Sequence, residues 1–139
     1  MKGRPVKAPR FRLVPNANPD ATAAEPPARL TAGAKSIWIE TAAKLDASGF
    51  EIPEIDDELF ANYCEIASTA RQLTELIEES GLLVPDERGV LRKNPAIATR
   101  NQAVVSLRQL SAELGISPGA RGRLQRQEGS REVNPFDQF

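Results

Sequence analysis

The sequence has 139 residues, a formal net charge of −1 and no histidine. This length suits one ordinary domain, and because only seven residues are aromatic (five Phe, one Trp and one Tyr), we expect a single modest core. The lack of histidine and the presence of one cysteine exclude Ser-His-Asp triads, Cys-His pairs, histidine general bases and the usual metal clusters. That cysteine, Cys64, cannot form an intramolecular disulfide, which favours a cytosolic setting, and its helical context predicts a small buried residue.

Charge is distributed unevenly along the chain. Residues 51–80 carry nine acids against Arg71, a balance of −8, whereas residues 1–20 carry five cations against Asp20, a balance of +4. The five cations are Lys2, Arg4, Lys7, Arg10 and Arg12. This asymmetry favours a polyanion-binding tail on an acidic body, although a solubilising tail beside a solvated acidic helix face would give the same pattern.

The two ends of the chain differ in composition from its middle. Residues 1–30 hold more than half of the eleven prolines and show no apolar periodicity, which predicts a disordered basic arm. Residues 125–139 are polar and predict a disordered tail, and the foldable core should span residues 31–124. No run of about 18 apolar residues exists, so we expect no membrane span, and the basic N-terminus lacks the apolar stretch of a secretory signal.

Helical periodicity dominates the middle of the chain. Thr31 offers a capping oxygen to a first helix that ends at Gly49, with Trp38 as its core anchor. Asp56 is expected to cap a second helix that ends at Gly81. Apolar residues follow the second helix at alternating four- and three-residue spacing: Leu59, Tyr63, Ile66, Ala70, Leu73 and Ile77. This seam predicts packing along the helix, either against the first and third helices or against another subunit.

A turn and two further helices follow. Short apolar runs on either side of residues 85–89 predict a small β-hairpin. Asn94-Pro95 is an N-cap followed by proline at the first helical position, and the helix it begins should end at Gly115. Ser117-Pro118 repeats this signal before a short helix to Leu124. The predicted fold is therefore mainly α, with three main helices, a small β-hairpin and a short C-terminal helix between disordered arms.

Enzymatic chemistry has little support. The glycines match neither of the phosphate-binding patterns GxxxxGK[ST] and GxGxxG, so ATP hydrolysis is not expected. Asp56, Asp57 and Glu58 could supply oxygen ligands to Mg²⁺ in a nuclease, but capping and the helix dipole explain acids in a first helical turn better. We expect a binding protein with no catalytic residue, no metal and no cofactor.

Binding to duplex DNA is the favoured chemistry. A flexible arm rich in Lys and Arg can follow a phosphate backbone, and the scarcity of aromatics argues against stacking on single strands. Further candidate contacts lie in and around the third and fourth helices: Arg92, Lys93, Arg100, Arg121 and Arg123, with Arg108 also on the third helix. These cations could line one surface or be scattered solvated charges.

Several short motifs in a fixed order resemble those of phage terminase small subunits, which pair with a large ATPase and nuclease subunit. They are Met1-Lys2-Gly3-Arg4-Pro5, the tryptophan at Trp38, the Gly81 stop before a hairpin, Lys93-Asn94-Pro95, and above all Glu113-Leu114-Gly115-Ile116-Ser117-Pro118-Gly119-Ala120-Arg121-Gly122-Arg123-Leu124. The resemblance covers nearly the whole chain. Two features depart from the family: the arm has few lysines, and residues 49–55 are too long for the turn of a tight helix-turn-helix.

The resemblance implies a helical, non-enzymatic subunit in the host cell cytoplasm. Such a subunit assembles into a homo-oligomeric ring, recognises double-stranded viral DNA and regulates the large terminase subunit. The aromatic pair Phe136 and Phe139 is spaced for one face of a helical turn, and we expect it either to dock on the large subunit or to fold back onto the core. The competing hypotheses are a phage-head scaffolding adaptor that binds only proteins and a metal nuclease.

Overall fold

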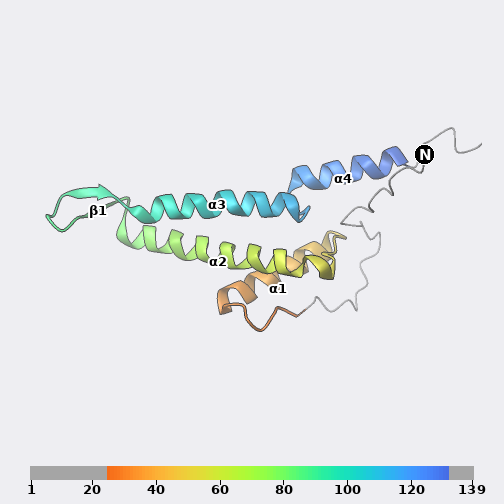
Figure 1. Ribbon diagram of the computed structural model, residues 1–139, viewed down its shortest axis with the longest axis horizontal. Coiled ribbons are helices and arrows are strands. Elements are labelled where there is room, and N and C mark those ends of the chain that lie inside the picture. The colour runs from red at the N-terminus through yellow and green to blue at the C-terminus, as the bar shows by residue number, and fades with distance from the viewer. Residues whose placement is uncertain (1–24, 132–139) are drawn as a thin grey trace, which may run out of the picture.

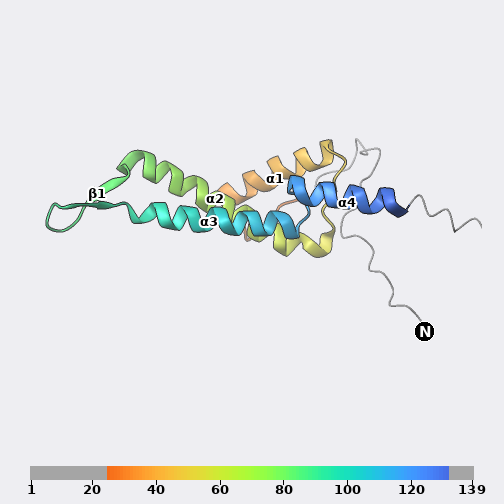
Figure 2. The ribbon, with the colours of Figure 1, turned by 90° about the horizontal axis from the view of Figure 1, so that it is seen from above.

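The computed structural model describes residues 25–131, with side-chain burial given as far as residue 127 apart from Leu124. Its elements in chain order are α1 (Ala32–Ala47), the 3₁₀ turn η1 (Glu54–Asp56), α2 (Asp57–Ser80), β1 (Leu83–Pro85), β2 (Leu91–Lys93), α3 (Pro95–Glu113) and α4 (Pro118–Arg131). Helices α2 and α3 form a long antiparallel pair joined by the hairpin, α1 lies on α2 near the opposite end, and α4 extends beyond that end (Figures 1 and 2). The mainly α prediction is confirmed.

Helix α1 begins as the sequence predicts. Thr31 has extended backbone angles, and its Oγ1 accepts a hydrogen bond from the Ala34 N–H at 3.3 Å. The folded chain already includes the residues before this cap, because Leu30 is buried in the core and Arg29 Nη2 lies 2.6 Å from Glu58 Oε1. The packed region therefore starts before Thr31, where the sequence predicted only an arm.

The start of α2 differs from the prediction. The Asp56 side chain caps nothing: the residue closes η1, and its N–H donates to the Pro53 carbonyl at 2.8 Å. A side-chain N-cap normally needs extended backbone angles, whereas Asp56 has φ −96° and ψ 5° because the 3₁₀ turn continues directly into the helix. The carboxylate of Asp56 consequently accepts no hydrogen bond from the first free N–H groups of α2.

Helix α2 packs against α1 and against α3. All residues of the predicted apolar seam, from Leu59 to Ile77, are buried or half-buried, which agrees with the intramolecular interpretation of the seam. A second row of the same helix, formed by Phe60, Cys64 and Ser68, is more deeply buried than the seam. Two packed faces explain how α2 can lie between two other helices.

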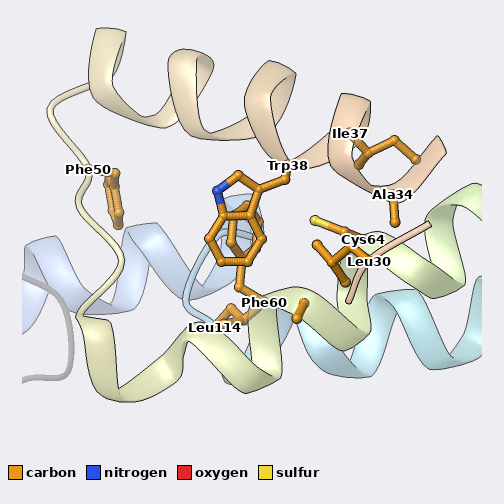
Figure 3. Packing of buried hydrophobic residues seen from close by; sticks show 9 residues of the cluster. Leu30, Ala34, Ile37, Trp38, Phe50, Phe60, Cys64 and Leu114 are labelled. Atoms are coloured by element: carbon orange, nitrogen blue, oxygen red, sulfur yellow. The ribbon is translucent and has the colours of Figure 1, made fainter. Parts of the chain in front are cut away.

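The core is small and lies where α1 crosses the first half of α2 (Figure 3). Trp38 is only 2% exposed, and its ring centroid lies 4.4 Å from that of Phe60 at an interplanar angle of 45°. Cys64 and Leu114 are fully buried beside these rings, which confirms the expected burial of the cysteine. Within α3 no residue is buried, and the buried residues of α2 do not extend beyond Ala70, so the half of the helix pair nearest the hairpin has little core of its own.

The predicted hairpin is present. Strands β1 and β2 are antiparallel, with Val84 opposite Arg92. Asp86 Oδ1 accepts hydrogen bonds from the N–H groups of Arg88 and Val90, which orders the turn, and Gly89 supplies the positive φ of 77° that the turn requires. A rigid turn thus holds the two short strands together at the tip of the molecule.

Asn94 connects the two long helices. Its Oδ1 accepts from the Ala96 N–H at 3.0 Å, which confirms the predicted cap of α3. Its Nδ2 donates to Ser80 Oγ at 2.9 Å and to the Gly81 carbonyl at 2.8 Å, at the end of α2. One buried side chain therefore caps one helix and binds the end of the other.

Helix α4 begins at Pro118, as predicted, and continues past Leu124 to Arg131. The predicted helix was shorter because residues 125–131 are polar and carry no apolar periodicity. Among the described residues, no helix is long and apolar enough to cross a membrane.

Candidate nucleic-acid interface

Seven predicted site residues lie outside the described part of the chain. They are the cations of the N-terminal arm, Lys2, Arg4, Lys7, Arg10 and Arg12, and the two aromatics of the tail, Phe136 and Phe139. Their proposed roles in DNA binding and partner binding stay predictions.

Two further candidates, Arg92 and Lys93, lie on β2 and are exposed. The Arg92 Nε is 3.1 Å from Asp86 Oδ2, so Asp86 partly neutralises this arginine. Hydrogen bonds from the Val90 N–H, from the Arg92 side chain and from the Arg88 N–H lower the pKa of Asp86, which keeps the carboxylate charged. Lys93 has no ion pair with any residue that the structure describes, and is therefore the freer cation of the two.

Arg100 is directed towards α2. Its Nε donates to Thr74 Oγ1 at 3.0 Å, and the residue is half-buried. Because this hydrogen bond joins α3 to α2, Arg100 has a structural role whether or not it also contacts a ligand.

The remaining candidates, Arg121 and Arg123, lie at the start of α4, at the end of the molecule opposite the hairpin (Figure 1). Arg123 is exposed. Arg121 lines an open pocket where the end of α1, the side of α2, the end of α3 and the start of α4 meet. Its Nε is buried and has no hydrogen-bond partner in residues 25–131.

The candidate cations therefore form two groups. Helix α3 has 19 residues, a length of about 28 Å, and it separates Arg92 and Lys93 from Arg121. The pocket also brings in Arg108, which the sequence placed on the third helix, and Lys44, which sequence reasoning did not select. No local pattern identifies Lys44, because it reaches the pocket from α1 only through the packing of α1 on α2.

The acidic cluster at the start of α2 shows no metal-binding geometry. Among the described residues, no group of three or more Asp, Glu, Cys or His side chains could hold a metal ion. Burial, followed by the charges of Glu54, Asp56 and Glu58, raises the pKa of Asp57. These neighbouring acids thus repel one another at the beginning of the helix.

Comparison with known proteins identifies the family. Residues 34–131 match the family model described as phage terminase, small subunit. Neither the curated proteins nor the solved structures gave a match. The matched region covers α1, α2, the hairpin, α3 and α4, which is well over half of the chain. The chain belongs to the phage terminase small subunit family.

Proposed function

We propose that this chain is the DNA-recognition subunit of a phage terminase, which forms a homo-oligomeric ring in the host cell cytoplasm and presents double-stranded viral DNA to the large subunit. The family match over residues 34–131 carries the proposal, because the small subunit of a terminase is generally the non-catalytic one. Two physical features support it: the five cations of the N-terminal arm for DNA, and apolar side chains exposed among the described residues for self-assembly.

DNA binding is assigned first to the N-terminal arm. Its five cations among the first twelve residues suit phosphate contacts that carry no sequence information. The test is retention of the full-length chain on duplex DNA at low salt, compared with a chain that lacks residues 1–12. Deletion should abolish retention, and alanine at each contacting cation should reduce the log-log salt slope by about 0.9 on every sequence tested. If the full-length chain shows no retention, a scaffolding adaptor that binds only proteins becomes the better assignment.

Self-assembly is assigned to the hairpin end. Large apolar side chains are exposed on the hairpin, near the end of α2 and at the middle of α3: Leu76, Leu82, Leu83, Val90, Leu91 and Val105. Monomeric proteins rarely expose such a concentration of apolar residues, and a ring forms if this patch binds a different surface of the next subunit with a rotation that closes. This surface is continuous with the weakly buried half of the α2 and α3 pair.

Light scattering with a matched pair of variants tests this assignment. The wild-type chain should have a mass several times that of one chain, and Leu91→Asp, at a residue 62% exposed on the hairpin, should reduce it to a monomer. Ile55→Asp changes a residue that is 89% exposed far from the hairpin, and should leave the mass unchanged. A wild-type monomer at micromolar concentration contradicts ring formation.

Contact with the large subunit is assigned to the tail residues Phe136 and Phe139. Removal of residues 134–139 should weaken binding to the large subunit and leave assembly and DNA affinity intact. If removal instead lowers the melting temperature or dissociates the oligomer, the tail is part of the fold.

A further inference from the structure

The pocket at the start of α4 is an open hollow of about 560 Å³. It is lined by Thr41, Lys44, Leu45, Ser48, Tyr63, Arg108, Ser111, Ile116, Ser117, Pro118 and Arg121. Three of these residues are cations, several carry hydroxyl groups and none is acidic. The lining therefore offers hydrogen-bond donors and positive charge, and the one carboxylate paired with a lining cation, among the described residues, is Glu40 beside Lys44.

The two arginines of the pocket lack partners within the described part of the chain. Arg108 and Arg121 form no ion pair there, whereas Lys44 Nζ lies 2.6 Å from Glu40 Oε1. The Nε of Arg121 is buried and donates to no acceptor among the residues that the structure describes. A buried donor without an acceptor is unfavourable and uncommon in proteins, so this N–H indicates an acceptor supplied from outside the chain.

The surroundings of Arg121 suit an anion with several oxygens. Helix α4 begins at Pro118, so the positive end of its dipole lies at the rim of the pocket. Arginine binds phosphate through paired N–H groups, and Arg108 reaches the pocket from a second helix. The apolar part of the lining, Leu45, Tyr63 and Ile116, leaves room for the organic portion of a phosphate ester.

A second hollow, of about 260 Å³, adjoins the first. The two share Ser48, Pro118 and Arg121, so Arg121 lies between them, and the second continues along α4 to Gln125. A chain of phosphates running along α4 would thus pass the guanidinium of Arg121.

We propose that this pocket binds a phosphate group, with Arg121 and Arg108 as its principal donors. The phosphate comes either from the backbone of duplex DNA, an assignment that rests on the proposed function, or from a free phosphate compound. In the first case the pocket is a second DNA contact, separate in sequence from the N-terminal arm and placed at the end of the molecule opposite the hairpin.

The test compares the full-length wild-type chain with Arg121→Gln, Arg108→Gln and the control Arg88→Gln. Arg88 is an exposed cation of the hairpin turn, without an ion pair among the described residues, so its variant matches the change in charge away from the pocket. The first measurement is the affinity for a fluorescein-labelled 20-base-pair duplex over a range of salt concentrations. The second measurement is the rise in melting temperature caused by inorganic pyrophosphate. Circular dichroism checks that each variant is folded.

For a DNA source, each pocket variant should weaken duplex binding about fivefold or more and reduce the log-log salt slope by about 0.9, whereas Arg88→Gln should bind as the wild type does. For a free phosphate source, pyrophosphate should stabilise the wild type and Arg88→Gln but neither pocket variant, with duplex binding unchanged. The pocket proposal is overturned if both pocket variants behave as Arg88→Gln does in both measurements.

Failure of the proposed function gives a different result. A wild-type chain with no affinity for duplex DNA would contradict DNA recognition. The melting-temperature measurement with pyrophosphate would still decide whether the pocket binds phosphate. Conversely, duplex binding that depends on residues 1–12 but not on Arg121 or Arg108 would keep the proposed function and remove the pocket from the DNA interface.

Discussion

The carboxylate of Glu65 accepts two hydrogen bonds from Thr31: the backbone N–H donates to Oε1 at 2.8 Å and the hydroxyl donates to Oε2 at 2.9 Å. Thr31 is also the N-cap of α1, and its Oγ1 accepts from the Ala34 N–H. A side chain of α2 therefore positions the residue that begins α1. This arrangement couples a local capping interaction to the packing of two helices.

Loss of this carboxylate should destabilise the fold. We expect Glu65→Ala to lower the free energy of unfolding by about 1 to 2 kcal/mol, because two hydrogen bonds to a charged acceptor are lost at a partly exposed site. Urea denaturation followed by circular dichroism measures the change. Glu75→Ala is the control, since Glu75 is exposed on the same helix and has no ion pair among the described residues. Equal stability of the two variants would mean that the Thr31 contact contributes little.

Gly33 lies where α1 packs closely against Ser68 of α2. A Cβ atom at this position would collide with Ser68 Oγ, which belongs to the buried row of α2. We expect Gly33→Ala to destabilise the protein by about 1 to 3 kcal/mol through overpacking, despite the better helix propensity of alanine. The melting temperature measures this loss.

Two further variants test the cause of that loss. Ser68→Gly removes the side chain that the new Cβ would meet, so the double variant should lose less stability than the sum of the single changes. Gly119→Ala is the matched control, because a Cβ there meets nothing within 4 Å, and its stability should be unchanged or slightly raised. Additive effects of Gly33→Ala and Ser68→Gly would argue against steric contact between these residues.

Asn94 should be sensitive to substitution because its side chain makes three hydrogen bonds at a buried corner. Asn94→Ala removes the cap of α3 and both bonds to the end of α2, with an expected loss of about 2 to 3 kcal/mol in urea denaturation. Asn94→Asp keeps a capping oxygen but loses the N–H donor facing the Gly81 carbonyl, and should lie between wild type and alanine. Asn101→Ala, an exposed asparagine of α3, should leave stability intact. If Asn94→Asp is as stable as the wild type, the bonds to α2 contribute little.

Local signals in the sequence were sufficient to locate the four helices, although α4 continues past its predicted end at Leu124. The caps at Thr31 and Asn94 are confirmed because a capping residue acts on backbone N–H groups two or three positions away. The helix boundary at Asp56 was predicted correctly, but the predicted side-chain cap was wrong. The 3₁₀ turn before α2 sets backbone angles that a sequence pattern does not reveal.

Burial and the pocket could be predicted only in part. Trp38 was identified as a core residue, but Phe60 and Leu30 were not, because their burial depends on where α1 crosses α2. The pocket is assembled from four helices, and Lys44 is far from Arg108 in the sequence. Spacing along the chain shows which residues share a helix face, whereas contacts between distant helices depend on the complete packing.

The buried thiol of Cys64 predicts a specific loss of stability at alkaline pH. Burial, with a smaller contribution from the charge of Glu65, raises the pKa of Cys64 from 9.0 to about 12. The unfolded chain loses the thiol proton near pH 9, while the folded chain keeps it. The contribution of the neutral thiol to the free energy of unfolding is therefore fully present below pH 9 and decreases as the pH rises towards 12.

Comparison with a variant that has no thiol isolates this effect. Between pH 9 and pH 10 the wild type should lose up to about 1.4 kcal/mol more unfolding free energy than Cys64→Ala, because the other titrating groups are common to both chains. Urea denaturation at pH 8, 9 and 10 gives the two slopes. The alanine variant should be less stable at pH 8, because removal of the buried sulfur leaves a small cavity beside Trp38 and Phe60, so the slopes rather than the absolute values are compared. Parallel pH profiles would show that the Cys64 thiol ionises as readily in the folded chain as in the unfolded one.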